Sequence, residues 1–472
     1  MIQSIAQKEF ISTLRDRRFA VLSGLVLLLL LAATLVGRAS FRTLQQERQL
    51  AQQTVNDQFR NQPARHPHRV AHYGSFAFRP KSGLSLLDGG VDSFTGSAAY
   101  LEAHQQNSIN FSQAQQAGSL IRFGEMTVAF VLQLLVPLLV IFLCFGAFSE
   151  ERATGTLKLL LSQGLTLRQV AWGKIVGYSQ AVALVVAPAL ALAAALLFTG
   201  EEFAGGPDLM ARLALFVVGY AVYFFVFVVG AVVVSAWQAS SRAALVTLLG
   251  FWILGCILLP KATANLGATL YPTITKAQMD AEVHEQAQHG INGHDPHDKR
   301  AEALKADLLK QYGVDSEEKL PVSLAGVQMA AGEEYSAKVY QQHFAALNAT
   351  YERQNRLSDW AGLLNPYQAI RPLSMGLAGS DYAHYVHFQQ AAETYRYGLV
   401  QRLNGLQVRM GHGDKERRLG ADTWRRLPVF SYQAPPLGWV LPRLLLPVAA
   451  LLLWAVGLCW LGLRLISKTS VA

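Results

Sequence analysis

Six long stretches of the chain contain no Asp, Glu, Lys or Arg, and they constrain the fold more than any other sequence feature. They comprise residues 19–36, 126–148, 175–198, 213–236, 243–260 and 444–463. A helix of 18 residues is about 27 Å long, close to the hydrocarbon thickness of a bilayer, which is about 30 Å. Because backbone groups in lipid must be paired internally, these stretches favour helices over isolated strands. The sequence predicts an all-α polytopic membrane protein with six transmembrane helices.

Composition agrees with this prediction. Only 15% of the residues are charged and 51% are hydrophobic, whereas about a quarter of the residues in an average soluble domain are charged. The three cysteines, Cys144, Cys256 and Cys459, all lie inside uncharged stretches. The soluble parts therefore have no disulfide framework and no cysteine-based zinc site. The first stretch is longer than the usual core of a signal peptide, so we expect it to be retained as a membrane anchor.

The distribution of charge predicts the orientation. With a cytoplasmic N-terminus, the cytoplasmic segments are 1–18, 149–174, 237–242 and 464–472, and the extracytoplasmic segments are 37–125, 199–212 and 261–443. The cytoplasmic segments then carry eleven Lys or Arg residues against four acids, while the longer extracytoplasmic segments are nearly balanced. Basic residues accumulate in cytoplasmic loops, so both termini are expected in the cytoplasm. The net charge of +9 is thus explained by topology and by contact with lipid, and no nucleic acid partner is expected.

Two large insertions separate the spans and are expected to form a mainly helical extracytoplasmic domain. In the first, 37–125, a polar helix should continue the first span, a loop with short strands should follow Pro63, and a second helix should run from about Tyr100 to Phe123. In the second, 261–443, apolar side chains recur every three or four residues, which is typical of amphipathic helices. The recurring residues are Ala301, Leu304, Leu308 and Tyr312; Tyr340, Phe344, Leu347 and Tyr351; and Tyr385, Phe388, Ala392, Tyr395, Leu399 and Leu406.

The cytoplasmic link 149–174 is the most informative motif. Leucines at 157, 160 and 161 predict a short helix that buries them at the membrane surface and exposes Glu151, Arg152 and Lys158 to the cytosol. The segment 1–18 would form an elbow beside it. An interfacial loop whose charges serve only topology is an equally open interpretation.

This link resembles the cytoplasmic region of type-2 ABC transporter permeases. The matching positions are Glu150, Glu151, Arg152, Gly155, Thr156, Leu159, Leu160 and Arg168, followed by Gly173 and Lys174. A second set resembles a subfamily with a large extracytoplasmic insertion of unassigned function: Asn365, Pro366, Ser374, Met375, Gly379, Asp381, Phe388, Tyr395 and Arg396. The resemblance implies a bacterial cytoplasmic (inner) membrane and an exporter or extractor of an amphipathic or envelope-associated substrate.

The chain has no Gly-x-x-x-x-Gly-Lys-Ser/Thr loop to bind nucleotide phosphates, so it is not expected to be an enzyme or to bind a cofactor itself. The resemblance implies a separate cytosolic ABC ATPase dimer that binds ATP and Mg²⁺. It also implies a second permease subunit, identical or paralogous, and contact with the lipid bilayer. The uncharged spans lack the ionisable groups that usually mark ion-coupled carriers. The alternative is a membrane-anchored sensor or scaffold whose extracytoplasmic domain binds a partner protein or a metal.

All twelve histidines lie in the two predicted extracytoplasmic insertions. The densest group, His284, His289, His294 and His297, is a candidate site for Cu²⁺ or Zn²⁺, because imidazole suits both ions. The glycines and proline within this group also fit a polar loop that binds nothing. His68 and His72 could share a helix face, although Pro67 precedes them.

Overall fold

A computed structural model describes residues 1–112, 126–199, 206–291 and 298–467. Six helical segments in these residues are long and apolar enough to cross a membrane, and each contains or overlaps one of the six predicted stretches. They are α2 (Arg17–Arg60), Val128–Ala153, α9 (Leu167–Phe198), α10 (Gly206–Trp237), Ser241–Leu270 and Leu437–Ser467. The prediction of a mainly helical chain with six helices long and apolar enough to cross a membrane is confirmed, which is consistent with a membrane protein.

Three of these segments combine shorter elements. The second comprises α5 (Val128–Phe130), the π-helical η3 (Val131–Leu135), α6 (Val136–Cys144) and α7 (Ser149–Ala153). The fifth comprises α11 (Ser241–Trp252), the π-helical η5 (Ile253–Leu258) and α12 (Leu259–Leu270). The sixth comprises α19 (Leu437–Val440), η9 (Leu441–Leu444) and α20 (Leu445–Ser467).

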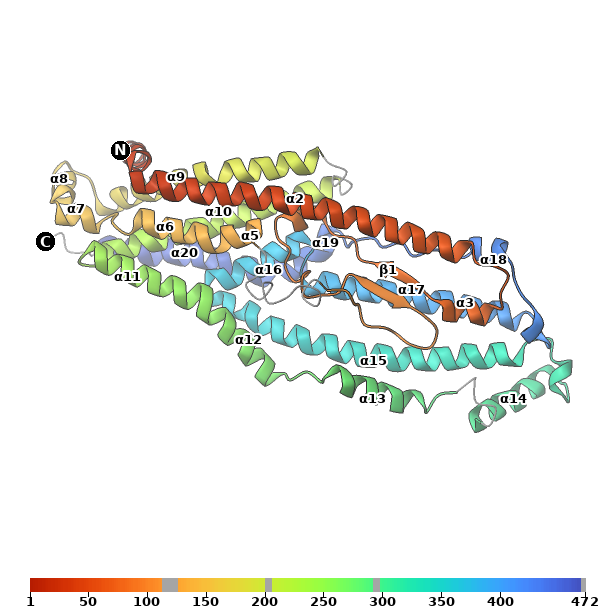
Figure 1. The fold of residues 1–472 in the computed structure, drawn as a ribbon. Helices are drawn as coiled ribbons and strands as arrows, with labels where there is room; N and C mark the ends of the chain where they lie inside the picture. The colour runs from red at the N-terminus through yellow and green to blue at the C-terminus, as the bar shows by residue number, and fades with distance from the viewer. Residues whose placement is uncertain (113–125, 200–205, 292–297, 468–472) are drawn as a thin grey trace.

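Helix α2 runs along most of the molecule (Figure 1). Asp16 caps its first turn by accepting a hydrogen bond from the Arg18 amide at 2.8 Å. Along the helix, Leu30 belongs to the large core of the bundle, whereas Phe59 belongs to a separate cluster with Trp424 and Leu403. The predicted polar continuation of the first span is therefore confirmed.

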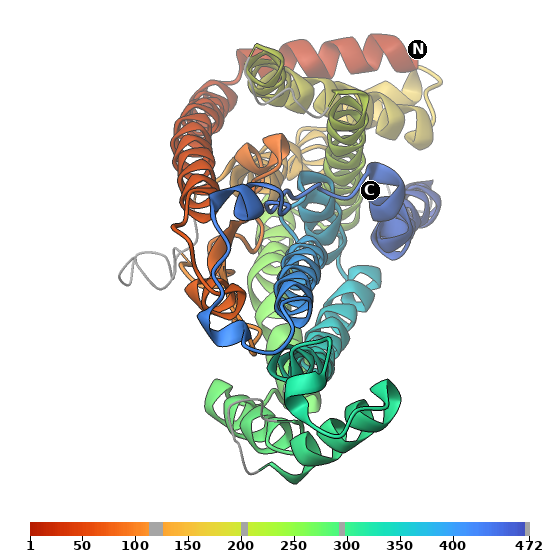
Figure 2. The ribbon, with the colours of Figure 1, turned by 90° about the vertical axis from the view of Figure 1, so that its right-hand side faces the viewer.

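The part beyond the bundle, which we call the distal domain, is built around an antiparallel pair of long helices, α15 (Leu324–Trp360) and α17 (Tyr382–Val408). Helices α13 (Lys276–Ala287) and α14 (Lys299–Tyr312) lie on the side of α15 away from α2 (Figure 2). The apolar repeats at 301–312, 340–351 and 385–406 are all helical, as predicted. The smaller elements are α3 (Pro67–Tyr73), η1 (Gly83–Leu86), η6 (Glu317–Lys319), η7 (Ala361–Leu363), η8 (Asp414–Glu416) and α18 (Ala421–Arg425).

The helix predicted from Tyr100 is wrong at its start. Tyr100 lies in β2 (Ala98–Leu101), which pairs antiparallel with β1 (Ser75–Phe78). Tyr100 stands opposite Phe76 with ring centroids 4.9 Å apart, a cross-strand aromatic pair that favours strand over helix. The end of the predicted helix, 113–123, lies outside the described residues.

At the opposite end of the bundle, α1 (Ile2–Arg15) packs across α9 beside α7 and α8 (Thr156–Ser162). Both ends of the described chain lie at this end of the molecule (Figure 1). We call it the basal end, and it corresponds to the predicted cytoplasmic segments.

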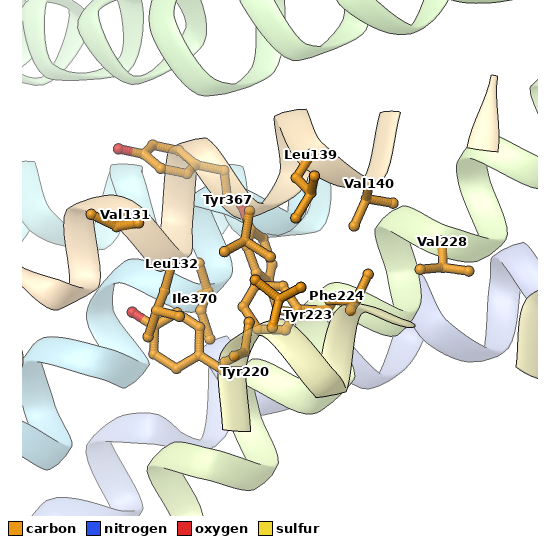
Figure 3. Close-up of a cluster of buried hydrophobic side chains, with 14 of the residues drawn as sticks. Val131, Leu132, Leu139, Val140, Tyr220, Tyr223, Phe224, Val228, Tyr367 and Ile370 are labelled. Carbon is orange, nitrogen blue, oxygen red and sulfur yellow. The ribbon is translucent and has the colours of Figure 1, made fainter. Parts of the chain in front are cut away.

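Helix α16 (Pro366–Ala378) belongs to the second insertion but packs inside the bundle, against α10 and α20. Its Tyr367 and Ile370 lie among side chains of η3 and α10 (Figure 3). The extracytoplasmic placement of 261–443 stays a prediction, but this helix shows that part of the insertion shares one core with the apolar helices. A stretch this short cannot span a bilayer, so it did not stand out by length.

Candidate functional site

Four charged side chains meet at the basal end, and we call them the basal ion cluster: Lys8, Glu9, Glu151 and Lys174. Lys174 is buried, with only 1% of the residue exposed. Its Nζ atom lies 3.1 Å from Glu9 Oε1 and 2.9 Å from Glu151 Oε1. Lys8 contacts the same two carboxylates at 2.8 and 3.1 Å. The cluster thus joins α1, α7 and α9, three segments that are far apart in the sequence.

Small residues let α1 approach α9 closely enough to form this cluster. A Cβ atom on Gly173 would lie 2.5 Å from the Ile5 Cβ, and one on Gly177 would lie 2.7 Å from the Ala6 carbonyl oxygen. Both distances are far below van der Waals contact, so these positions require glycine while α1 stays in place. The position of Glu9 beside Lys174 therefore depends on two glycines in the facing helix.

The cluster favours the charged form of Glu9. Burial by itself raises the pKa of the Glu9 carboxyl, but the ammonium groups of Lys174 and Lys8 outweigh burial and lower the pKa below its ordinary value. The negative charges of the two carboxylates equal the positive charges of the two ammonium groups, so the cluster has no net charge. Such an arrangement is strongly destabilised when a single member is removed.

Arg152 ties the link to α10. Its Nη2 and Nη1 atoms donate to the carbonyl oxygens of Ala236 at 2.6 Å and Gln238 at 3.0 Å, where α10 ends. A guanidinium there satisfies orphan carbonyls and complements the helix dipole. Glu151 and Arg152 are only partly exposed, less than expected, because both bind groups of neighbouring helices.

The remaining residues of the predicted coupling motif form the outer surface of the link. Gly155 precedes α8 with a left-handed φ of 76°, a conformation that glycine adopts without strain. Leu157 is buried in the bundle core, and Leu160 is half-buried. The exposed residues are Glu150, Gly155, Thr156, Lys158, Leu159 and Arg168. The link therefore has an inner face bound to the bundle and an outer face available to another protein.

A second polar network connects α16 to the spans. Gln133 Nε2 in η3 donates to the Tyr220 hydroxyl at 2.8 Å, and that hydroxyl lies 3.0 Å from Ser374 Oγ in α16. Ser374 in turn donates to Asp88, which follows η1. Burial raises the pKa of the Asp88 carboxyl. An acidic residue from the first insertion thus enters the bundle, although the predicted spans contain none.

The two π-helical segments lie beside α16. The Asn365 side chain caps α16 by accepting from the Tyr367 amide at 3.1 Å, and its Nδ2 donates to the Gly255 carbonyl of η5 at 2.5 Å. The Tyr223 hydroxyl donates to the Gln133 carbonyl of η3 at 2.8 Å. Side chains thus satisfy backbone carbonyls that the irregular helices present, and π segments occur frequently at functional sites.

Sequence reasoning missed Lys8, Glu9, Asp88, Gln133 and Tyr220 as members of these networks. Asn365 and Ser374 were noted only through the resemblance. A usable signal was the stretch 360–370, which has no Asp, Glu, Lys or Arg but is too short to span a bilayer, a pattern typical of a re-entrant or buried segment. No local signal marks Glu9, because its partner Lys174 is 165 positions away.

The predicted histidine group is described in part. His284 in α13 and His289 after it are exposed, whereas His294 and His297 lie outside the described residues. The predicted metal site at these four residues therefore stays a prediction. A different histidine group, formed by His68, His72 and His104, comes together in space.

Comparison with protein families matches residues 276–433 to a domain of unknown function, DUF3526. The matched part extends from the start of α13 to just before α19 and includes α14, α15, α16 and α17. Among curated proteins, none matches the chain. The family match thus covers most of the second insertion, including the helix that packs inside the bundle.

Proposed function

We propose that the chain is the membrane-spanning permease subunit of an ATP-driven transporter similar to the type-2 ABC class. The observation that carries this proposal is the basal ion cluster, which links the exposed coupling motif to α1 and α9 through Lys174. A separate ATPase dimer would dock on the exposed face of the link, and a second permease subunit would complete the pathway. In this proposal the basal end faces the cytoplasm and the distal domain lies outside the membrane.

Motion would pass from the ATPase into the bundle by two routes. Displacement of α7 would pull α9 and α1 through Glu151 and Lys174, and it would pull the end of α10 through Arg152. Helix α10 also carries Tyr220, which bonds to Ser374 of α16. The distal domain would thus respond to events at the basal end, because α16 directly precedes α17. Packed elements with two discrete arrangements are the usual carriers of such coupling.

Isolation of the native complex tests the proposal. The chain would be purified in mild detergent from its host and analysed by native mass spectrometry. We expect a nucleotide-binding subunit in the complex and either one or two permease species. If repeated preparations contain no ATPase, the proposal is refuted, and a stable partner of another kind would favour the sensor or scaffold.

A charge reversal on the exposed face tests the docking surface. Arg168→Glu should reduce recovery of the ATPase, because this exposed residue lies in the matching motif. Arg242→Glu is the matched control, since Arg242 is also an exposed arginine of the basal end but lies in the first turn of α11. Equal loss of ATPase in both variants would argue against docking at 149–174.

A neutral change inside the cluster tests transmission separately. Glu151→Gln leaves the exposed face of the link unchanged but removes one carboxylate from Lys174. We expect the complex to assemble and hydrolyse ATP, with hydrolysis no longer coupled to movement of the spans. Distance measurements between spin labels on α9 and α10, with and without nucleotide, report that coupling. Nucleotide-dependent distances identical to those of the unsubstituted protein would contradict the proposed route.

A further inference from the structure

Three histidines of the first insertion converge in the distal domain. His68 and His72 lie one turn apart on α3, and their Nε2 atoms are 3.1 Å apart. His104 follows β2, and its ring centroid lies 5.1 Å from that of His72 and 5.7 Å from that of His68. One ligand nitrogen from each residue lies within 4.8 Å of the others. The three imidazoles therefore face a common point.

The backbone holds this group together. Residues four apart share a helix face, so α3 alone aligns His68 with His72. The Ala103 amide donates to the Ala71 carbonyl of α3 at 3.2 Å, which fixes the loop that carries His104. His104 has a φ of 69°, and among the described residues only one other non-glycine residue has a positive φ. Such a conformation is unfavourable for a residue with a side chain and occurs preferentially at functional sites.

A buried carboxylate orients His104. Glu333 of α15 is fully buried, and its Oε2 accepts from the His104 amide at 2.8 Å and lies 3.4 Å from His104 Nδ1. Arg396 of α17 holds the other oxygen at 2.6 Å and is itself held by Glu393 at 2.7 Å. Carboxylates in this position fix the orientation and tautomer of histidines that bind metals. With Nδ1 beside Glu333, Nε2 is the nitrogen of His104 that can bind an ion.

We propose that His68, His72 and His104 bind one divalent transition-metal ion of the kind that prefers imidazole, Zn²⁺ or Cu²⁺, with Glu333 as the residue that positions His104. Zinc–nitrogen bonds of about 2.0–2.1 Å at tetrahedral angles place ligand nitrogens about 3.3 Å apart, close to the spacing of His68 and His72. Small rotations of the partly exposed His104 and the exposed His72 bring the third nitrogen to the same spacing. Three imidazoles without thiolates favour these ions over Ca²⁺ or Mg²⁺, which prefer oxygen.

The ion would connect parts of the domain that are distant in the sequence. It would join α3 to the loop after β2 directly and would reach α15 and α17 through Glu333 and Arg396. The exposed side of His72 leaves a fourth coordination position for water or a small ligand. This proposal is independent of transport, and it differs from the predicted site at His284, His289, His294 and His297.

Metal binding to the purified full-length chain tests the proposal. The protein would carry an affinity tag without histidine, be stripped with a chelator, and be titrated with ZnCl₂ by isothermal calorimetry. We expect one tight site per chain that is weakened at least tenfold by His72→Gln and by about 10–100-fold by Glu333→Gln. X-ray absorption at the zinc edge should show three imidazole nitrogens at about 2.0–2.1 Å.

The control is His284→Gln, which removes an exposed histidine of the other candidate group and should leave the affinity unchanged. Because His72 is exposed, His72→Gln should also leave the melting temperature of the metal-free protein unchanged, which separates lost binding from misfolding. The proposal is overturned if the wild-type chain binds no zinc at micromolar concentration. It is also overturned if His72→Gln binds as tightly as wild type, or if His284→Gln alone abolishes the site.

Discussion

Replacement of Lys174 by Met should destabilise the protein far more than an ordinary lysine substitution. The change keeps the length and volume of the side chain but removes its charge. Glu9 and Glu151 then share only Lys8, whose side chain is 58% exposed. The carboxylates themselves are only 7% and 13% exposed, so water replaces the lost partner poorly.

The expected cost follows from this geometry. Breaking a buried ion pair by removing one partner costs about 3–5 kcal/mol. Because Lys8 still contacts both carboxylates, we expect the lower end of this range, about 3 kcal/mol. The double variant Lys174→Met with Glu9→Gln removes one charge of each sign and leaves Glu151 paired with Lys8. Its cost should be smaller than the sum of the single costs by about 2 kcal/mol.

Unfolding of the purified chain in mixed micelles, followed by tryptophan fluorescence, measures these differences. Lys158→Met is the matched control, since Lys158 belongs to the same link but is exposed, and it should change stability by no more than about 0.5 kcal/mol. If Lys174→Met is as stable as Lys158→Met, or if the double variant equals the sum of the single variants, the assigned role of the cluster is refuted.

Three further predictions concern other networks. Burial by itself raises the pKa of the Glu333 carboxyl, but its hydrogen bonds and the charge of Arg396 outweigh burial and lower the pKa. The free energy of unfolding should therefore fall as the pH drops below about 4.3, the pKa of a glutamate in an unfolded chain. Glu333→Gln should make this fall smaller. Gly90→Ala places a Cβ 2.4 Å from a carbonyl oxygen at positive φ and should lower the melting temperature more than Gly155→Ala. At Gly155 the added Cβ meets no atom within 4 Å, so only the left-handed φ contributes, at about 1–2 kcal/mol. Tyr220→Phe should cost about 1–2 kcal/mol in the same unfolding assay.

Two features of the α16 network bear on the function proposed above. The network brings Asp88 and Ser374 from the two insertions into the bundle, and it does so beside both π-helical segments. Regular helices pack with all backbone groups satisfied, so π segments that bind side chains are places where a small change of register is least costly. If the proposed transport function holds, the α16 region is the part of the bundle in which we expect the largest rearrangement.

Local sequence patterns predicted the features that depend on neighbouring residues alone. The six spans follow from uncharged length, and the end of α14 follows from Gly313, which has the left-handed conformation expected after a helix. Helix α9 begins at Leu167, before the predicted span, because Thr166 and Gln169 form a capping box. This Thr-x-x-Gln signal is also local and could have been used.

The errors concern residues whose environment is set by distant partners. Tyr100 is a strand residue because Phe76 lies opposite it, and Glu151 is turned inward because Lys174 is buried beneath it. In both cases the neighbouring residues in the sequence were also compatible with the alternative, a helix at Tyr100 and an exposed side chain at Glu151. A partner more than twenty positions away decided which alternative formed.

The sequence by itself determined the helical class and the positions of the six long apolar helices, since hydrophobic length acts through the nearest residues. Only the tertiary structure decided which charges are buried together, that α16 returns into the bundle, and that His104 meets His68 and His72. Those features depend on contacts between residues that are far apart in the sequence. Burial changes the free energy of a charge or a polar group only after the whole fold has excluded water from it.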